Sequence, residues 1–238
     1  MKNNTIHNSA VEPNVQHLIE IQNIGKDYQE GENTVQAIKE MTFFIDDGEF
    51  VAIMGQSGSG KSTLLSILGG LNHPSMGKVL LDSLDIYKLS SEQRADLRSE
   101  YIGVIFQSFQ LIPYLTVLEN VKLPMAITGK KSKTQDKMAR DVLARVGLAN
   151  KADRLPDQLS GGEQERVAIA RAIVNKPPIL LADEPTGSLD SHTADEILNL
   201  LKELNEEGQT IIMVTHNPDA CKDTTRTIHV KDGSCYAH

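Results

Sequence analysis

The chain has 238 residues and a formal net charge of −8; 24% of its residues are charged and 39% are hydrophobic. This length allows a sizeable core and indicates one soluble domain, while the acidic balance argues against broad binding to nucleic-acid phosphates. No apolar run reaches the roughly 18 residues that span a bilayer, and the polar start lacks the apolar core of a signal peptide, so we expect a cytosolic protein.

The first third of the chain has the pattern of a series of strands. Residues 1–16 are polar and lack periodicity, and we interpret them as a flexible extension. Apolar runs interrupted by turn residues then predict strands at 18–21, 35–38 and 41–45, paired in antiparallel fashion. A continuous apolar run at 50–54 predicts a further strand, which leads directly into a glycine-rich turn.

That turn, Gly55 to Ser62, matches the pattern G-x-x-x-x-G-K-[ST] in full, and an amphipathic helical run follows at 64–68. Glycines let the backbone curl so that successive N–H groups point at phosphate oxygens, and the positive end of the next helix faces the same anion. Lys61 is predicted to reach the β- and γ-phosphates, and the Ser62 hydroxyl to bind Mg²⁺. The pattern therefore predicts a nucleoside triphosphate site.

The middle of the chain, residues 90–158, has the pattern of a mostly helical insert. Ser90 and Thr116 each begin a capping box, which predicts the start of a helix at both places. Between them, an apolar run at 101–106 predicts a short strand. The lysine-rich run at 130–133 is interpreted as a solvated turn before another helix.

The last third returns to alternating strands and helices. A buried strand is predicted at 179–182, an amphipathic helix at 194–204 and another strand at 210–215. Such alternation implies right-handed crossovers and a parallel sheet with its ligand site at the carboxyl ends of the strands. We therefore expect a single α/β domain over 17–238, with a P-loop NTPase (RecA-like) core made of 17–89 and 159–238. The expected sheet is mostly parallel and is joined by an antiparallel β subdomain and the inserted α-helical subdomain.

Two adjacent carboxylates, Asp183 and Glu184, end the strand predicted at 179–182. Successive side chains at a strand end point to different sides, so the pair can divide two tasks. Asp183 is predicted to hold Mg²⁺, and Glu184 to face the γ-phosphate and polarise the attacking water.

A second helix start carries Ser160, Gly161 and Gly162 ahead of an apolar helical run. A hydroxyl, bare backbone N–H groups and the helix dipole together make an anion site of the same physical type as the P-loop. The same residues also fit an ordinary N-cap turn, and their chemistry alone leaves both interpretations open.

In this order, the motifs resemble those of the ATP-binding-cassette (ABC) ATPase family over nearly the whole chain, from Leu18 to Gly233. The segments that carry the resemblance are the Walker A loop at Gly55–Ser62, the Q-loop at Gln107, the signature at Leu159–Glu163, the Walker B strand at Ile179–Glu184, the D-loop at Ser188, Leu189 and Asp190, and the switch histidine His216. In the family, two cassettes pair head to tail, and the signature of one closes over ATP held by the P-loop of the other. The resemblance thus implies two composite sites in a homodimer.

Further roles come only from the resemblance. It implies that Tyr28 stacks on adenine beside Val35, although Tyr28 also fits a half-buried strand aromatic. It also implies that Gln107 offers its amide oxygen to Mg²⁺ and that His216 contacts the γ-phosphate. Glu163 replaces the glutamine common in the family and is expected to act with Ser160 in trans. The ATP-binding residues implied around the P-loop are Gly55, Gln56, Ser57, Gly58, Ser59, Gly60, Lys61, Ser62 and Thr63.

The segment from Phe106 to Pro124 is similar to the lipoprotein-release and macrolide-export branch of the family. This similarity implies an ATPase subunit that uses Mg-ATP, binds a second copy of itself and drives a separate membrane permease at the cytoplasmic face of the membrane. Three alternatives remain: a nucleotide-gated mechanical partner of a membrane protein, a soluble ABC ATPase acting on DNA or ribosomes, and a small-molecule P-loop kinase.

Overall fold

The computed structural model describes residues 17–31 and 33–237, and the predicted extension at 1–16 lies outside this part of the chain. Its strands form two sheets, one of four strands and one of six. Across the residues that are described, no helix combines the length and apolar character needed to cross a membrane.

The smaller sheet is antiparallel and contains the N-terminal strands. In spatial order its members are β2 (Asn33–Ile45), β1 (Ile19–Glu30), β4 (Met76–Leu81) and β5 (Leu84–Asp85). β2 is one strand of 13 residues, whereas the sequence pattern predicted two separate strands, at 35–38 and 41–45. Glu40 lies between those two segments with φ of 43°, and the register with β1 shifts there. A bulge thus carries the pairing through the predicted break.

The larger sheet holds the strands that position the phosphate loop. In spatial order its members are β10 (Ser234–Ala237), β9 (Arg226–Lys231), β3 (Phe50–Met54), β8 (Thr210–Thr215), β7 (Ile179–Asp183) and β6 (Ile102–Ile105). Every neighbouring pair is parallel except β10 with β9. The predicted mostly parallel sheet is therefore confirmed, and the carboxyl ends of β3, β7 and β8 meet at one edge.

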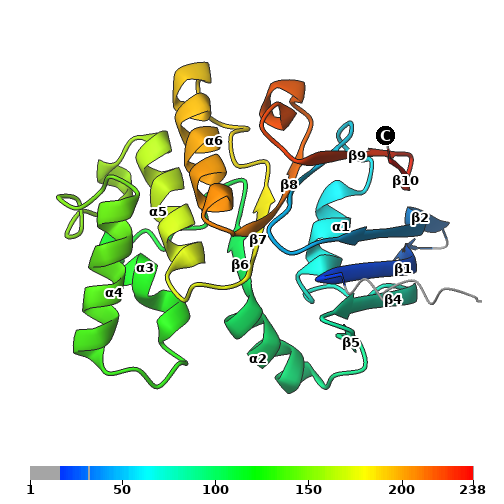
Figure 1. Cartoon of the computed structure of the whole chain (residues 1–238), viewed down its shortest axis with the longest axis horizontal. Helices are drawn as coiled ribbons and strands as arrows, with labels where there is room; N and C mark the ends of the chain where they lie inside the picture. Colours follow the sequence, from blue (N-terminus) through cyan, green and yellow to red (C-terminus); the bar gives the residue numbers. More distant parts are fainter. Residues whose placement is uncertain (1–16, 32, 238) are drawn as a thin grey trace, which may run out of the picture.

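Successive residues of the central strands face two separate cores. Ala52 and Leu180 pack in one core, and their neighbours Val51 and Leu181 pack in the other. This alternation follows from the two-residue period of a strand and explains why these runs are apolar throughout. The first core is completed by helices α3 (Val117–Lys122), α4 (Ser132–Arg145), α5 (Gly161–Ile173) and α6 (Ser191–Glu206), and the second by α1 (Lys61–Leu68) and the smaller sheet (Figure 1).

The predicted insert at 90–158 contains helices α2 (Ser91–Tyr101), α3 and α4. The capping boxes predicted at Ser90 and Thr116 are confirmed. Strand β6 also falls in this range, but it pairs with β7 at the edge of the six-stranded sheet, so it belongs to the core. Short 3₁₀ turns occupy Leu123–Met125, Pro156–Gln158 and Pro218–Cys221. We refer below to α3, α4 and the loop between them as the helical lobe.

Candidate nucleotide-binding site

The phosphate loop leaves the carboxyl end of β3 and enters α1 at Lys61. Gly60 has φ of 100° and lies so close to the smaller sheet that a Cβ there would be 2.4 Å from the carbonyl oxygen of Ala37. At Gly55 a Cβ would be 2.2 Å from the carbonyl oxygen of Val230. Since no side chain fits at such separations, both glycines are required by the close approach of neighbouring strands.

A cavity of about 680 Å³ opens over this loop. It brings together the carboxyl ends of three strands of the larger sheet and the loop that follows β6. Its lining residues are Ala37, Met54, Gly55, Gln56, Ser57, Gly58, Gly60, Lys61, Ser62, Thr63, Gln107, Glu184 and His216. The predicted P-loop residues except Ser59, which is buried, thus lie with Gln107, Glu184 and His216 around one space. Ala37 is a lining residue that the sequence patterns did not predict.

Lys61 is held inside the loop. Its side chain is only 6% exposed, and Nζ donates hydrogen bonds to the carbonyl oxygens of Gly55 at 2.8 Å and Gln56 at 3.0 Å. The same Nζ lies 3.9 Å from a Glu184 carboxylate oxygen. The cation is therefore already oriented toward the cavity, where it can meet phosphate oxygens.

Ser62 and Asp183 provide the oxygen atoms that suit a magnesium ion. The Ser62 hydroxyl donates a hydrogen bond to Asp183 Oδ1 at 3.2 Å. Burial raises the pKa of Asp183, the Ser62 hydrogen bond opposes this shift, and the nearby Glu184 charge adds to it. Hydroxyl and carboxylate oxygens fit Mg²⁺, which takes few protein ligands and keeps water and phosphate oxygens around it. Gln107 lies on the wall of the same cavity.

Glu184 is joined to His216. Both carboxylate oxygens lie 2.9 Å from His216 Nδ1, and the backbone N–H of His216 donates to Oε2 at 3.4 Å. Glu184 has φ of 48°, a left-handed conformation that is costly for this residue type. Its side chain is 11% exposed, whereas that of His216 is 61% exposed. The strained backbone thus fixes a shielded carboxylate, and the histidine that contacts it faces solvent.

The signature residues begin helix α5 with a complete capping box. The Ser160 hydroxyl accepts from the Glu163 N–H at 3.3 Å, and the Glu163 carboxylate accepts from the Ser160 N–H at 3.0 Å. This backbone hydrogen bond holds the pKa of Glu163 below its usual range, and Lys151, at 3.1 Å, adds to the effect. The N-cap interpretation of the sequence is therefore confirmed for Ser160.

The signature also packs against the predicted D-loop. A Cβ at Gly162 would be 2.3 Å from Thr193 Cγ2, and one at Gly161 would be 3.4 Å from Leu189 Cδ2. Asp190 caps α6 by accepting from the Thr193 N–H at 3.1 Å, and Ser188 is exposed. None of these residues is among those that line the P-loop cavity. Within one chain, the structure brings the signature to the D-loop and not to the P-loop.

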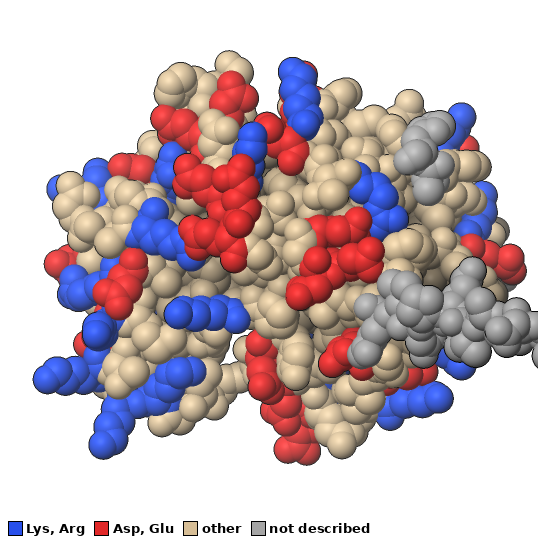
Figure 2. All heavy atoms as spheres, viewed as in Figure 1, with Lys and Arg blue, Asp and Glu red and all other residues tan. Residues whose placement is uncertain are grey.

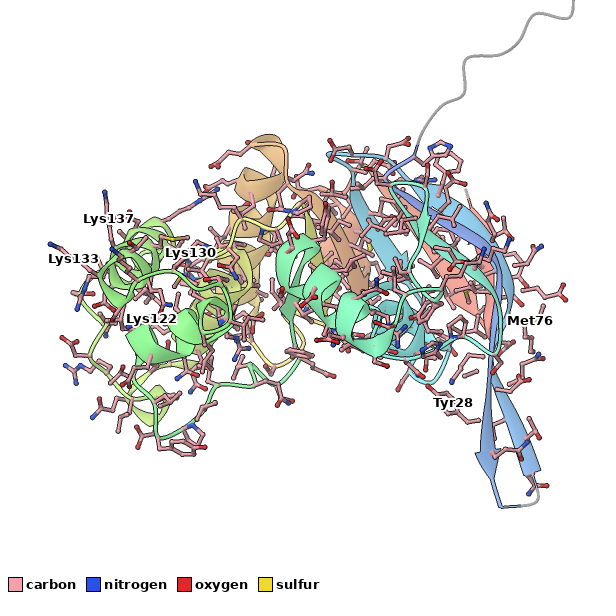
Figure 3. All side chains as sticks on the ribbon, turned by 90° about the horizontal axis from the view of Figure 1, so that it is seen from below. Tyr28, Met76, Lys122, Lys130, Lys133 and Lys137 are labelled. Carbon is pink, nitrogen blue, oxygen red and sulfur yellow. The ribbon has the colours of Figure 1, made fainter. Side chains whose placement is uncertain are left out.

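Tyr28 and Val35 face each other across β1 and β2 but do not line the cavity. The Tyr28 hydroxyl accepts a hydrogen bond from the Asn72 amide, and Lys26 Nζ lies 4.9 Å from the ring centroid. Figure 3 shows Tyr28 and Met76 near the base of the hairpin of β1 and β2. Stacking of Tyr28 on adenine therefore stays a prediction.

Arg171 is a site residue that the sequence patterns missed. From helix α5 its guanidinium donates to the carbonyl oxygen of Phe109 at 2.7 Å and to that of Gln110, in the loop that carries Gln107. Phe109 and Gln110 have φ of 59° and 51°. No local sequence pattern predicts this contact. Arg171 lies about 60 residues from Phe109 and Gln110 in the chain, and the acceptors are backbone atoms, which every residue has.

Comparison with known proteins identifies the family. A family model described as ABC transporter matches residues 38–187. The chain is 47% identical over 216 residues to an uncharacterized ABC transporter ATP-binding protein, YvrO, of Bacillus subtilis, covering 91% of this chain and 94% of that protein. The chain belongs to the ABC transporter family. It is accordingly an ABC ATPase domain, with the nucleotide-binding α/β fold expected from the sequence.

Other members of the ABC transporter family agree in sequence and structure. The chain is 46% identical over 217 residues to the macrolide export ATP-binding/permease protein MacB of Mannheimia succiniciproducens, covering 91% of this chain but 34% of MacB. It superposes with a TM-score of 0.85 on the dimeric structure of MJ0796, a bacterial ABC transporter cassette, at 45% identity over 91% of this chain and 96% of that one. Another MJ0796 structure is a dimer in a post-hydrolysis state bound to ADP and Pi.

Proposed function

We propose that this chain is the ATP-binding subunit of an ABC transporter and that two copies pair head to tail around two molecules of Mg-ATP. The separation of the two anion-binding helix starts carries the proposal: Ser160 to Gly162 begin α5 outside the lining of the P-loop cavity. A two-fold pair presents each surface twice, so it can place the Ser160 end of each copy over the P-loop of the other. The dimeric MJ0796 cassette, 45% identical to this chain, supports this arrangement.

Each composite site would divide the chemistry among residues that already lie around the cavity. Lys61 exchanges its bonds to the Gly55 and Gln56 carbonyls for phosphate oxygens. Ser62 and Asp183 would hold Mg²⁺ with Gln107, and the ion, when bound, supplies charge neutralisation at the phosphates.

The Glu184 carboxylate acts on water. Glu184 orients and polarises the attacking water, and His216 keeps that carboxylate in place from the solvent side. The Ser160 hydroxyl and the glycine N–H groups of the second copy complete the phosphate shell and exclude bulk water.

Closure and reopening of this pair would drive a separate membrane permease at the cytoplasmic face of the membrane. The cargo that we favour is a lipoprotein, a peptide or a hydrophobic drug-like molecule, moved by export or by extraction. Support for this class is the 46% identity to a protein named for macrolide export. A nucleotide-gated mechanical role without transport uses the same cassette chemistry and is the second candidate.

Substitution of Glu184 tests the composite site. Glu184→Gln keeps the shape of the side chain but replaces the carboxylate by a neutral amide, which cannot polarise water as a base. We therefore expect ATP hydrolysis to fall by about a hundredfold or more. ATP should then convert the variant from monomer to a stable dimer in size-exclusion chromatography with light scattering. The exposed Glu203→Gln is the matched control and should behave as wild type. Wild-type turnover in Glu184→Gln, or full activity of the wild-type monomer at every dilution, would refute the composite site.

The permease proposal needs a separate measurement. Affinity purification of the tagged chain from detergent-solubilised membranes should recover an integral membrane protein in stoichiometric amount. Transport of labelled lipoprotein, peptide or macrolide by the reconstituted pair then identifies the cargo class. Recovery of ribosomes without a membrane protein would instead support the soluble alternative.

A further inference from the structure

A cluster of lysines occupies the outer end of the helical lobe. We call it the lysine corner; its members are Lys122, Lys130, Lys131, Lys133 and Lys137. Figure 3 shows four of them on the helical lobe, on the side of the molecule away from the hairpin of β1 and β2, with Lys133 and Lys137 at its outer edge. Over the face seen in Figure 2, Lys and Arg gather at the same end, while Asp and Glu gather over the centre of the molecule.

The charges of this corner are largely unneutralised. Among the described residues, the only ion pair within it joins Lys122 to Asp136. Lys133 and Lys137 are exposed and four residues apart on α4, so they lie on one face of that helix. Because the whole chain carries a formal charge of −8, this corner opposes the sign of the rest of the molecule. Ordinary solubility does not require such a reversal, since the acidic surface already supplies net charge.

An exposed apolar side chain lies within the same corner. Ile127 is 74% exposed in the loop between α3 and α4, and Leu123, one turn earlier, is 37% exposed. The loop is held in shape: the Gln135 amide donates to the carbonyl oxygens of Met125 at 3.2 Å and Lys130 at 2.9 Å. Met125 itself is fully buried. The fold therefore presents Ile127 on an anchored loop with Lys130 and Lys131, between helices that carry the other three lysines.

We propose that the lysine corner binds the surface of a bilayer that contains anionic phospholipid, with Ile127 inserted among the headgroups. Lysines are flexible point charges that match a fluid array of phosphates, and their attraction to an anionic leaflet adds up over the cluster. An exposed apolar side chain between lysines is the composition of segments that lie at a membrane interface. This inference goes beyond the proposed function because lipid contact needs neither ATP nor a permease.

Vesicle binding of the purified chain tests the proposal. The wild type is mixed at low salt with phosphatidylcholine vesicles that contain or lack phosphatidylglycerol, and bound protein is measured by flotation. The test variant is Lys130→Gln/Lys133→Gln/Lys137→Gln. The control, Lys78→Gln/Lys88→Gln/Lys222→Gln, removes the same charge from exposed lysines outside the lobe. Ile127→Ser tests the apolar contact, and ATP hydrolysis and thermal unfolding are measured for every variant.

We expect the wild type to bind only the vesicles that contain phosphatidylglycerol, and salt should weaken this binding by screening. The test variant should bind about a hundredfold more weakly, because three lysine–headgroup attractions are lost. The control should bind as wild type, Ile127→Ser should bind more weakly, and hydrolysis should be unchanged. Equal binding by the test and control variants, or equal binding to neutral vesicles, would overturn the proposal. Absence of wild-type binding, with loss of the co-purifying permease from the test variant, would assign the corner to a protein partner instead. If the wild-type chain did not hydrolyse ATP, the proposed function would be refuted, but the proposal for the lysine corner would not be affected.

Discussion

The Arg171 guanidinium, on the helix that begins with the signature, donates to the carbonyl oxygen of Phe109 at 2.7 Å. It thereby fastens the loop of Gln107 to α5, three turns from Ser160. Helix α5 thus begins with the signature and, through Arg171, also contacts the loop whose Gln107 lines the P-loop cavity of the same chain. Movement of either end would be transmitted to the other through a single rigid element.

Arg171→Lys should therefore slow turnover without weakening ATP binding. Lysine keeps the charge but lacks the fork that reaches two carbonyls, and the left-handed Phe109 and Gln110 would be free to relax. We expect the kcat for ATP hydrolysis to fall by about tenfold or more, with KM nearly unchanged. Arg166→Lys, at a surface ion pair on the same helix, is the control. A matched fall in kcat for both variants would argue against a positioning role for Arg171.

His216→Ala should reduce hydrolysis because the Glu184 carboxylate loses the ring nitrogen that lies 2.9 Å away. We expect about a hundredfold lower kcat, measured by phosphate release, with nucleotide binding retained. His192→Ala is a suitable control because His192 is 84% exposed and lies on α6. Equal turnover in the two variants would remove His216 from the site chemistry.

Gly129 and Gly60 both have left-handed backbones, but only Gly60 lies close to a neighbouring strand. Alanine at each position therefore separates the cost of backbone strain from the cost of a steric clash. Gly129 has φ of 66°, and a Cβ added there would meet no atom beyond its chain neighbours within 4 Å, whereas at Gly60 a Cβ would lie 2.4 Å from the Ala37 carbonyl oxygen. Gly129→Ala should cost about 1 kcal/mol in the free energy of unfolding and leave ATP binding intact. Gly60→Ala should cost more and abolish ATP binding, as measured by denaturation and by titration with a fluorescent nucleotide. Retained binding in Gly60→Ala would contradict the close approach.

Glu165 predicts a pH dependence of stability. It is fully buried on α5, and neither carboxylate oxygen has a hydrogen-bond partner among the described residues. Burial raises its pKa from 4.5 to about 8, and the Arg171 charge opposes this shift only in part. Between these two pKa values the folded chain keeps a proton that the unfolded chain has lost, so this carboxyl makes the fold less stable as the pH rises through that window.

Glu165→Gln should remove that contribution. Relative to wild type, the variant should gain stability between about pH 5 and about pH 8 in urea unfolding. Glu203→Gln, at an exposed position of α6, should keep the wild-type profile. Parallel pH profiles for wild type and Glu165→Gln would show that Glu165 is ionised in the folded protein.

The local patterns of the sequence determined much of this protein. The strand at 50–54, the phosphate loop behind it and the capping boxes at Ser90 and Thr116 are all in place. Each of these features depends on backbone angles and hydrogen bonds among residues a few positions apart, which residue type and spacing specify directly. The order of such motifs was enough to indicate the family.

Tertiary structure alone decided which distant elements meet. It joined β6 to the core sheet, carried β2 through the bulge at Glu40 and placed Arg171 against the loop of Gln107. It also explained the need for glycine at position 60, where the Ala37 carbonyl leaves no room for a Cβ. These outcomes depend on contacts between segments far apart in the chain. A local residue pattern does not specify which distant backbone atoms will pack against it.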